Sequence, residues 1–437
     1  MADVASTLEE PVVPILPALP IAKRHLLSAV VGNALEFYDF TIFAYFASQI
    51  GQTFFPSQTT IGSLLPTLAT FWVGFLSRPI GGIAIGIYAD RSGRKPAMVL
   101  SFALMGIGIL ALALTPSYAA IGIAAPILVV LARLLQGFAL GGQVGPSTAF
   151  LLEAASPKSR GYYTTFQYSS QGLATLCGGF VGVVLSSLLD ASSLQHWGWR
   201  VAMALGALVL PFGLIIRRTM PETMERPTES NSVLKLAVPR AAGRVRVVVL
   251  GLLMLASATI CTYVLNYMTT YATVFLHMRA NVSFGATMVF GACNIVFSLV
   301  GGAMSDKYGR RPVMIWPRVF LLFAIYPAFV LLSQNRDAVT LLSVTAIIAI
   351  LSTWSAAASL VNIAEAMPKD MRSGALGTVY AVAIFAFGGS TQYVVTWMIG
   401  ITGNVLAPAW YLTVATFVGL VSMILAKETA PVRLKEI

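Results

Sequence analysis

The chain has 437 residues, of which 57% are hydrophobic and only 10% are charged, and its mean hydropathy is +0.80. Soluble domains carry roughly 25% charged residues, so this composition excludes an ordinary soluble protein and predicts a membrane protein with many spans. The formal net charge of +11 does not indicate nucleic-acid binding, because most Lys and Arg residues fall in tails and loops on one predicted side.

The first 23 residues are acidic and rich in proline, and they lack the basic start and short apolar core of a cleaved signal peptide. We therefore expect a disordered cytoplasmic tail at 1–23. Apolar runs long enough to cross a bilayer as helices follow this tail. The twelve predicted spans are about 24–50, 61–88, 97–115, 120–152, 162–189, 198–216, 246–276, 282–304, 313–333, 339–366, 373–401 and 408–427.

The longest polar break inside the membrane region follows the sixth predicted span. It divides the chain into a six-helix bundle at 24–216, a central cytoplasmic loop at 217–245, a second six-helix bundle at 246–427 and a short cytoplasmic tail at 428–437. The bias of basic residues toward one side predicts that both termini are cytoplasmic. Few basic residues are expected on the opposite side, namely Arg200, Arg279 and Arg336.

Two polar loops of the first half return in the second half. The loop GIYADRSGRKP at 86–96 returns as GAMSDKYGRRP at 302–312. The pattern ExxxPxxRG, which begins at Glu153, returns in similar form as ExxPxxxRxG from Glu365. These paired loops predict two parallel six-helix repeats.

The paired loops resemble those of the major facilitator superfamily. Three further stretches, GNALEFYDF at 32–40, FLSRPIGG at 75–82 and ARLLQG at 132–137, are similar to the metabolite:proton symporter family of bacterial inner membranes. The resemblance implies an all-α polytopic membrane protein with twelve transmembrane helices in two pseudo-symmetric six-helix bundles. It also implies proton-coupled uptake by alternating access. Members of that family import citrate, tricarballylate, 2-oxoglutarate, shikimate, proline or betaine.

Ionisable side chains deep in a span are costly, which makes them functional candidates. Glu36 and Asp39 lie deep in the first predicted span, and Arg133 lies about as deep in the fourth. The resemblance implies that these two helices face each other. We therefore predict that Asp39, Glu36 and Arg133 carry proton coupling, without a choice between the two carboxylates as the titrating group. The alternative is a static ion pair that holds the two helices together.

Arginine can bind a carboxylate through two parallel hydrogen bonds, so Arg133 is the first candidate for substrate binding. Arg78 is a second candidate, although it could instead anchor its proline-containing helix. Arg318, close to the loop before the ninth span, is expected to extend to the membrane interface. Polar residues in central spans complete the predicted substrate-binding set: Asn33, Gln136, Gln143, Gln167, Gln171, Tyr263, Asn266, Tyr267, Asn362, Tyr380 and Gln392. Interhelical hydrogen bonding is an equally good interpretation for any single one of these polar residues.

Gln143 departs from the pattern of many members of the family, which carry a glutamate at this point of the fourth helix. A neutral amide cannot carry a proton, so coupling through this position is not expected in this chain. The change also removes a negative charge from the predicted cavity, which favours a more anionic substrate.

The charged residues of the repeated loops are predicted to form a cytoplasmic gate. Contacts among them would hold the inner side closed and would break when the two bundles swing inward. The alternative is a simple topology anchor. The predicted gate residues are Asp90, Arg91, Arg94, Glu153, Arg160, Asp306, Arg310, Arg311, Glu365 and Arg372.

We therefore predict a secondary active transporter that imports citrate or a related tricarboxylate with protons. A dicarboxylate such as 2-oxoglutarate, or shikimate or betaine, is the alternative substrate. An exporter is less favoured because the fifth span lacks the exporter motif, and nothing indicates an enzyme or a receptor domain. We expect no cofactor and no metal site, since Cys177, Cys261 and Cys293 all lie in apolar segments. The expected partners are a small organic anion, protons and the lipid bilayer, with the protein as a monomer.

Overall fold

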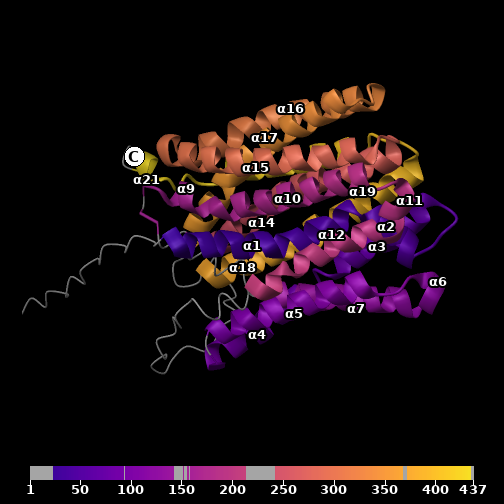
Figure 1. The fold of residues 1–437 in the computed structure, drawn as a ribbon. Helices are drawn as coiled ribbons and strands as arrows, with labels where there is room; N and C mark the ends of the chain where they lie inside the picture. Colours follow the sequence, from indigo (N-terminus) through magenta and orange to yellow (C-terminus); the bar gives the residue numbers. More distant parts are fainter. Residues whose placement is uncertain are drawn as a thin grey trace, which may run out of the picture.

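The computed structural model describes residues 23–92, 94–141, 151, 155–156, 158–212, 242–367 and 372–434. Helices cover most of this part of the chain, which contains no β-strand. The start of α1 (Lys23–Tyr45) and the short helix α21 (Pro431–Leu434) lie at the same end of the molecule (Figure 1).

The first half of the chain folds into helices that lie close to one another and are coloured indigo to magenta in Figure 1. After α1 they are α2 (Ala47–Phe54), α3 (Thr60–Val73), α4 (Arg78–Ser92), α5 (Arg94–Leu114), α6 (Tyr118–Ile121), α7 (Ala124–Leu140), α9 (Arg160–Thr164), α10 (Phe166–Leu188), α11 (Ala191–Ser193) and α12 (Trp199–Leu205).

The second half forms a second group of helices, coloured orange to yellow. They are α14 (Ala242–Thr270), α15 (Ala280–Tyr308), α16 (Arg310–Gln334), α17 (Ala338–Ala366), α18 (Arg372–Ala383), α19 (Gly389–Thr402), α20 (Ala407–Leu425) and α21. A π-helical turn, Ile384–Gly388, separates α18 from α19 inside the predicted eleventh span. Such turns are frequent at functional sites.

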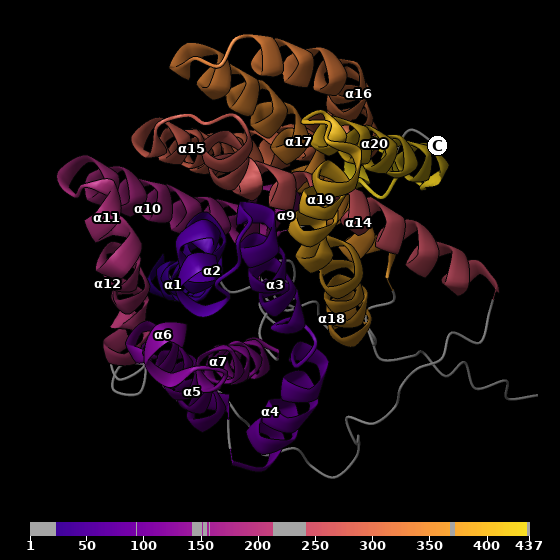
Figure 2. The same cartoon turned by 90° about the vertical axis from the view of Figure 1, so that its right-hand side faces the viewer.

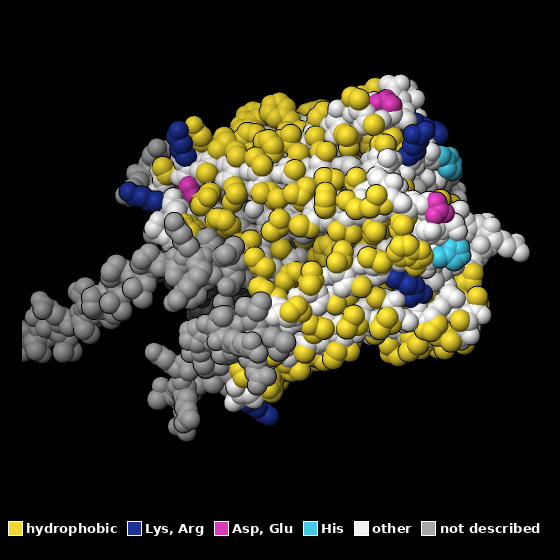
Figure 3. Space-filling view, viewed as in Figure 1, with side chains coloured by type: hydrophobic (Ala, Val, Ile, Leu, Met, Phe, Trp, Pro, Cys, Tyr) yellow, Lys and Arg dark blue, Asp and Glu magenta, His cyan; other side chains and the backbone are white. Residues whose placement is uncertain are grey.

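Nine helical runs in the described residues are long and apolar enough to cross a membrane. On the face shown in Figure 3, apolar side chains cover the middle of the molecule, and the described charged side chains lie toward its two ends. The helices α1 with α2, α7 and α12 occupy the other three predicted spans. The nine runs are Thr60–Tyr88, Pro96–Leu114, Arg160–Leu188, Val245–Phe275, Ala280–Tyr308, Arg310–Gln334, Ala338–Ala366, Leu376–Thr402 and Ala407–Leu425.

The two halves meet along α10 and α15, which lie side by side (Figure 2). Glycines allow this close approach, because a Cβ on Gly291 would overlap the backbone of Leu176. A Cβ on Gly172 would lie 2.8 Å from the backbone nitrogen of Ile295. Small residues at such contacts let helix backbones pack closely in a membrane, so α10 and α15 bring both halves around a shared centre.

Candidate functional site

Asp39 of α1 and Arg133 of α7 form an ion pair in the first half. Arg133 Nη1 donates to Asp39 Oδ2 at 3.1 Å and to Gln136 Oε1 at 2.7 Å. Gln136 Nε2 donates to Asp39 Oδ1 at 3.4 Å. The two charged side chains have no exposed surface, and Gln136 is equally buried. Residues expected on facing helices are therefore in direct contact.

Aromatic rings surround the guanidinium groups of Arg133 and Arg78. The Arg133 guanidinium carbon lies 4.5 Å from the ring centre of Phe40 and 4.3 Å from that of Phe43. The Arg78 carbon lies 4.6 Å from the Phe40 centre and 4.3 Å from that of Phe75. Ring faces attract cations, and more strongly where water is excluded, so these rings stabilise two buried charges.

A central cavity lies between the two halves of the chain. Its volume, counted as space open to water, is about 40 Å³. Its described lining combines aromatic rings with hydroxyl and amide groups and includes no charged side chain. The lining residues are Phe37, Phe40, Thr41, Ala44, Phe71, Tyr168, Gln171, Thr175, Ala258, Thr259, Thr262, Tyr263, Asn266, Phe290, Asn294, Tyr380, Ile384 and Gln392.

Five of the predicted substrate-binding residues line this cavity. Gln171 Nε2 donates to the hydroxyl of Tyr380 at 3.5 Å, which joins the two halves. The amide of Asn266 accepts a hydrogen bond of 2.8 Å from Tyr45. The five residues are Gln171, Tyr263, Asn266, Tyr380 and Gln392.

The other predicted polar residues that the structure describes lie outside the lining and form hydrogen bonds to other segments of the chain. Asn33 of α1 donates to Ser170 Oγ of α10 at 2.6 Å, and Gln167 donates back to Asn33 at 3.3 Å. The Tyr267 hydroxyl lies 2.5 Å from that of Thr396 on α19. These contacts match the structural interpretation of such residues.

Among the predicted coupling and substrate-binding residues, the structure does not describe the side chain of Glu36 or any part of Gln143. Conversely, the sequence did not single out Asn294 of α15 or Thr259 of α14, which also line the cavity. Asn294 is an amide inside a long apolar helix, and this isolated polarity was the signal that could have identified it.

The expectation for Arg318 is wrong, because its side chain does not reach the membrane interface. It is fully buried, and its Nη1 donates to the sulfur of Cys261 on α14 at 3.2 Å. The helix α16 packs against α17 and α20, and Arg318 points into this packing. Its Nε and Nη2 have no hydrogen-bond partner among the described residues.

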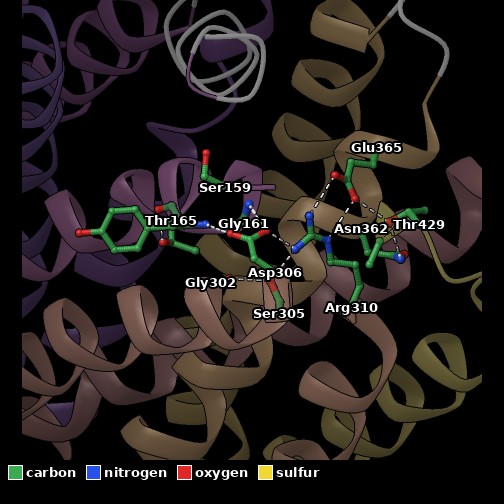
Figure 4. Close-up of polar contacts among 12 residues, drawn as sticks. Ser159, Gly161, Thr165, Gly302, Ser305, Asp306, Arg310, Asn362, Glu365 and Thr429 are labelled. Carbon is green, nitrogen blue, oxygen red and sulfur yellow. Dashed lines mark hydrogen bonds and ion pairs between the residues drawn. The ribbon is translucent and has the colours of Figure 1, made fainter. Parts of the chain in front are cut away.

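A second ionic group, here called the Arg310 cluster, comprises Asp306, Arg310 and Glu365 (Figure 4). Arg310 donates through Nη1 to Asp306 at 2.6 Å. Its Nε and Nη2 both donate to Glu365 at 3.1 Å, in the parallel geometry that guanidinium and carboxylate groups favour. Three predicted gate residues from α15, α16 and α17 are thus joined.

Asp306 also connects the two halves of the chain. Its two carboxylate oxygens accept hydrogen bonds from the backbone N–H groups of Gly161, at 2.8 Å, and Tyr162, at 2.9 Å. These groups belong to the first turn of α9, where N–H groups lack partners within a helix. The Arg310 cluster therefore holds the first half as well as the second.

The segment after α20 completes the Arg310 cluster. Glu428 accepts from the backbone N–H groups of Arg310 and Arg311, both at 2.9 Å. The Thr429 hydroxyl donates to Glu365 at 2.8 Å. Asn362, predicted to bind substrate, instead donates to the Lys427 carbonyl at 2.9 Å. The sequence predicts only a tail at 428–437, and Glu428, an acidic residue directly after the last span, is the signal for its contact with the basic residues at 310–311.

Among the described side chains of the predicted gate, those of Arg91, Arg160 and Arg311 make none of these contacts. The Arg311 guanidinium donates to the carbonyl of Ile424 at 2.8 Å and is held at the end of α20 instead of facing α9. Arg91 is exposed, and Arg160 Nε is buried without a hydrogen-bond partner among the described residues. The side chains that lie outside the described part are Asp90, Arg94, Glu153 and Arg372.

Comparisons with known proteins agree with this architecture. The family model of the Major Facilitator Superfamily matches residues 29–296, and that of sugar and other transporters matches residues 224–437. A citrate-proton symporter from Klebsiella pneumoniae is 33% identical over 91% of this chain and 90% of its own length. The alpha-ketoglutarate permease of Escherichia coli K12 is 35% identical over 94% of this chain and 95% of its own.

Among solved structures, a crystal structure of a D-xylose-proton symporter superposes with a TM-score of 0.74 at 18% identity. The superposition covers 93% of this chain and 97% of that protein, and it supports the fold alone. The matches to the family models, the coverage of nearly the whole chain by its relatives and the helical architecture all indicate the same family. The chain therefore belongs to the Major Facilitator Superfamily, as a secondary transporter that is not an enzyme.

Proposed function

We propose that this protein imports an organic carboxylate together with protons, and that the carboxylate is citrate or a related tricarboxylate. The observation that carries the proposal is a neutral polar cavity backed by two buried arginines, one of which is paired with Asp39. Phe40 lines the cavity and contacts both guanidinium groups. The similarity to a citrate-proton symporter supports the same substrate.

The charges around the cavity favour an anionic substrate. No acidic side chain is found among the described lining residues, so a carboxylate in the cavity would meet hydroxyl and amide donors without repulsion from the wall. Arg78 and Arg133 lie behind that wall and supply positive charge. Arginine is suited to this role because it stays charged and matches carboxylate geometry.

The Asp39–Arg133 pair provides a route to proton coupling. When a substrate carboxylate attracts Arg133, Asp39 loses its ionic partner, and a buried carboxylate without a partner is costly. Binding a proton removes that cost. Substrate and proton would then bind together, as symport requires. Glu36 remains a further candidate carrier of the proton.

The Arg310 cluster is proposed to act as the gate on the cytoplasmic side. It lies at the same end of the molecule as both described chain ends (Figure 1), and the excess of basic residues in the loops of one predicted side supports a cytoplasmic position for that end. Contacts from Asp306 to α9 would hold the two halves together there and break during alternating access. We place the protein in a bacterial inner membrane as a multi-pass monomer.

A dicarboxylate such as 2-oxoglutarate is the second candidate substrate, favoured by the 35% identity to an alpha-ketoglutarate permease. Purified protein in proteoliposomes with an imposed inward proton gradient separates the candidates. We expect uptake of citrate above tricarballylate, 2-oxoglutarate, shikimate and betaine, and loss of that uptake when an ionophore collapses the gradient. Greater uptake of another member of the panel would reassign the substrate. Citrate uptake that does not depend on the proton gradient would contradict the proposal of proton symport.

A further inference from the structure

Phe40 contacts both the central cavity and the buried arginines. Its ring contacts the guanidinium groups of both Arg78 and Arg133, and no other described ring does so. The same side chain lines the cavity, and it follows Asp39 directly in α1. A single side chain therefore contacts both the cavity and two cations.

The other aromatic rings fix the Phe40 ring in place. Its centre lies 5.2 Å from that of Phe75 and 6.2 Å from that of Phe71, and only 4% of the residue is exposed. The aromatic packing fixes the face that the ring presents to the guanidinium groups. A leucine would fill much of the same space without the ring electrons that attract a cation.

From this arrangement we propose that Phe40 is a positioning residue that holds Arg78 and Arg133 together behind the cavity wall. Asp39 neutralises one of the two guanidinium groups held by this ring, so the ring presents two positive charges to the cavity once Asp39 binds a proton. This arrangement selects substrates with at least two carboxylates. Phe40 also links substrate binding to Asp39. A carboxylate in the cavity attracts Arg133 across the Phe40 ring, and this attraction weakens the ion pair between Arg133 and Asp39. The inference rests on the proposed function, since it assumes a carboxylate in the cavity.

The test compares two replacements of Phe40. Phe40→Leu removes the ring and keeps apolar bulk, whereas Phe40→Tyr keeps the ring. We expect the Kd for citrate, measured by calorimetry on purified protein, to rise about tenfold or more in Phe40→Leu and to stay within about threefold of wild type in Phe40→Tyr. Rescue by the aromatic replacement separates the effect of the ring from general loss of packing.

Phe54→Leu is the matched control. Phe54 is as deeply buried and also faces an arginine, with the guanidinium carbon of Arg200 at 5.6 Å from its ring centre, but it lies outside the cavity lining. The same substitution there should leave the citrate Kd within about twofold of wild type. If Phe40→Leu does not yield folded protein, Phe40→Met carries the same expectation.

Two results would overturn the inference. One is a citrate Kd in Phe40→Leu equal to that of wild type, and the other is an equal loss in Phe40→Tyr and Phe40→Leu. Either result leaves the proposed function intact as long as the wild-type protein binds citrate. If wild-type protein binds none of the carboxylates in the panel, the proposed function itself fails.

Discussion

Arg133 and Asp39 come from helices far apart in the sequence, yet their charged groups meet at 3.1 Å with no exposed surface on either side chain. An isolated charge at this depth would cost several kcal/mol, and here each group has a partner of opposite charge. Removing one partner of a buried pair typically destabilises a protein by about 3–5 kcal/mol. Burying two charged groups in a membrane protein costs free energy even when they are paired. A role in transport would explain why this chain contains such a pair.

The first prediction concerns the planar guanidinium group of Arg133. Arg133→Lys keeps the charge but loses the planar group that bonds Asp39 and Gln136 together. We expect the citrate Kd to rise at least tenfold, measured by calorimetry on the purified variant. Arg200→Lys is the control, because Arg200 bonds the backbone carbonyls of Ala113 and Thr115 outside the cavity. Equal affinities in both variants would show that Arg133 does not bind substrate.

The second prediction concerns the contact between the halves at Asp306. Asp306→Asn removes the charge that accepts from Gly161, Tyr162 and Arg310, and hydrogen bonds to charged groups contribute about 1.5–3 kcal/mol each. We expect faster hydrogen–deuterium exchange across 160–166 in the variant. Exchange there should stay at the wild-type rate in Asp190→Asn, which removes a carboxylate that bonds only its own helix start. Unchanged exchange in Asp306→Asn would mean that Asp306 does not hold α9.

A third prediction tests the segment after α20. Glu428→Ala leaves the N–H groups of Arg310 and Arg311 without their acceptor, as happens when a helix loses its N-cap, which costs about 1 kcal/mol. We expect a lower midpoint of thermal unfolding in detergent and faster amide exchange at Arg310 and Arg311. If the variant matches wild type in both measurements, the segment 428–434 does not stabilise the start of α16.

The fourth prediction concerns pH and the start of α17. Asp337 accepts from the backbone N–H of Thr340 at 2.9 Å and from its hydroxyl at 2.7 Å, and these bonds lower the pKa of the Asp337 carboxyl. The stabilisation is therefore complete above the ordinary carboxyl pKa near 4 and is lost as pH falls through the lowered value. Asp337→Ala should unfold at a lower temperature than wild type at pH 7, and the difference should shrink as pH falls below about 4. A difference that does not change with pH would exclude an ionised cap.

The sequence was sufficient for the spans and for the central ion pair. Spans are long apolar runs that any helix crossing the bilayer needs, and the described helices follow them closely. Asp39 and Arg133 stood out because charges are rare inside such runs. Which helices face one another came from family resemblance, because hydropathy contains no information about pairing.

Other features depended on packing that no local pattern encodes. Arg318 was expected near the interface from its distance to a loop, but the rotation of α16 turns its side chain toward Cys261. Glu428 lies only a few residues beyond the last span, and its role depends on how the chain folds back onto Arg310. The position of Phe40 could not be predicted, since a phenylalanine in a span normally signals only packing.

The most direct test of the central claim compares Asp39→Asn with wild type in proteoliposomes, under an inward proton gradient and again in citrate counterflow without a gradient. The account predicts that the variant loses accumulation of citrate against its gradient by at least tenfold, because the amide cannot bind a proton, while counterflow exchange continues. Accumulation by Asp39→Asn to the wild-type level would contradict the account and remove Asp39 from proton coupling.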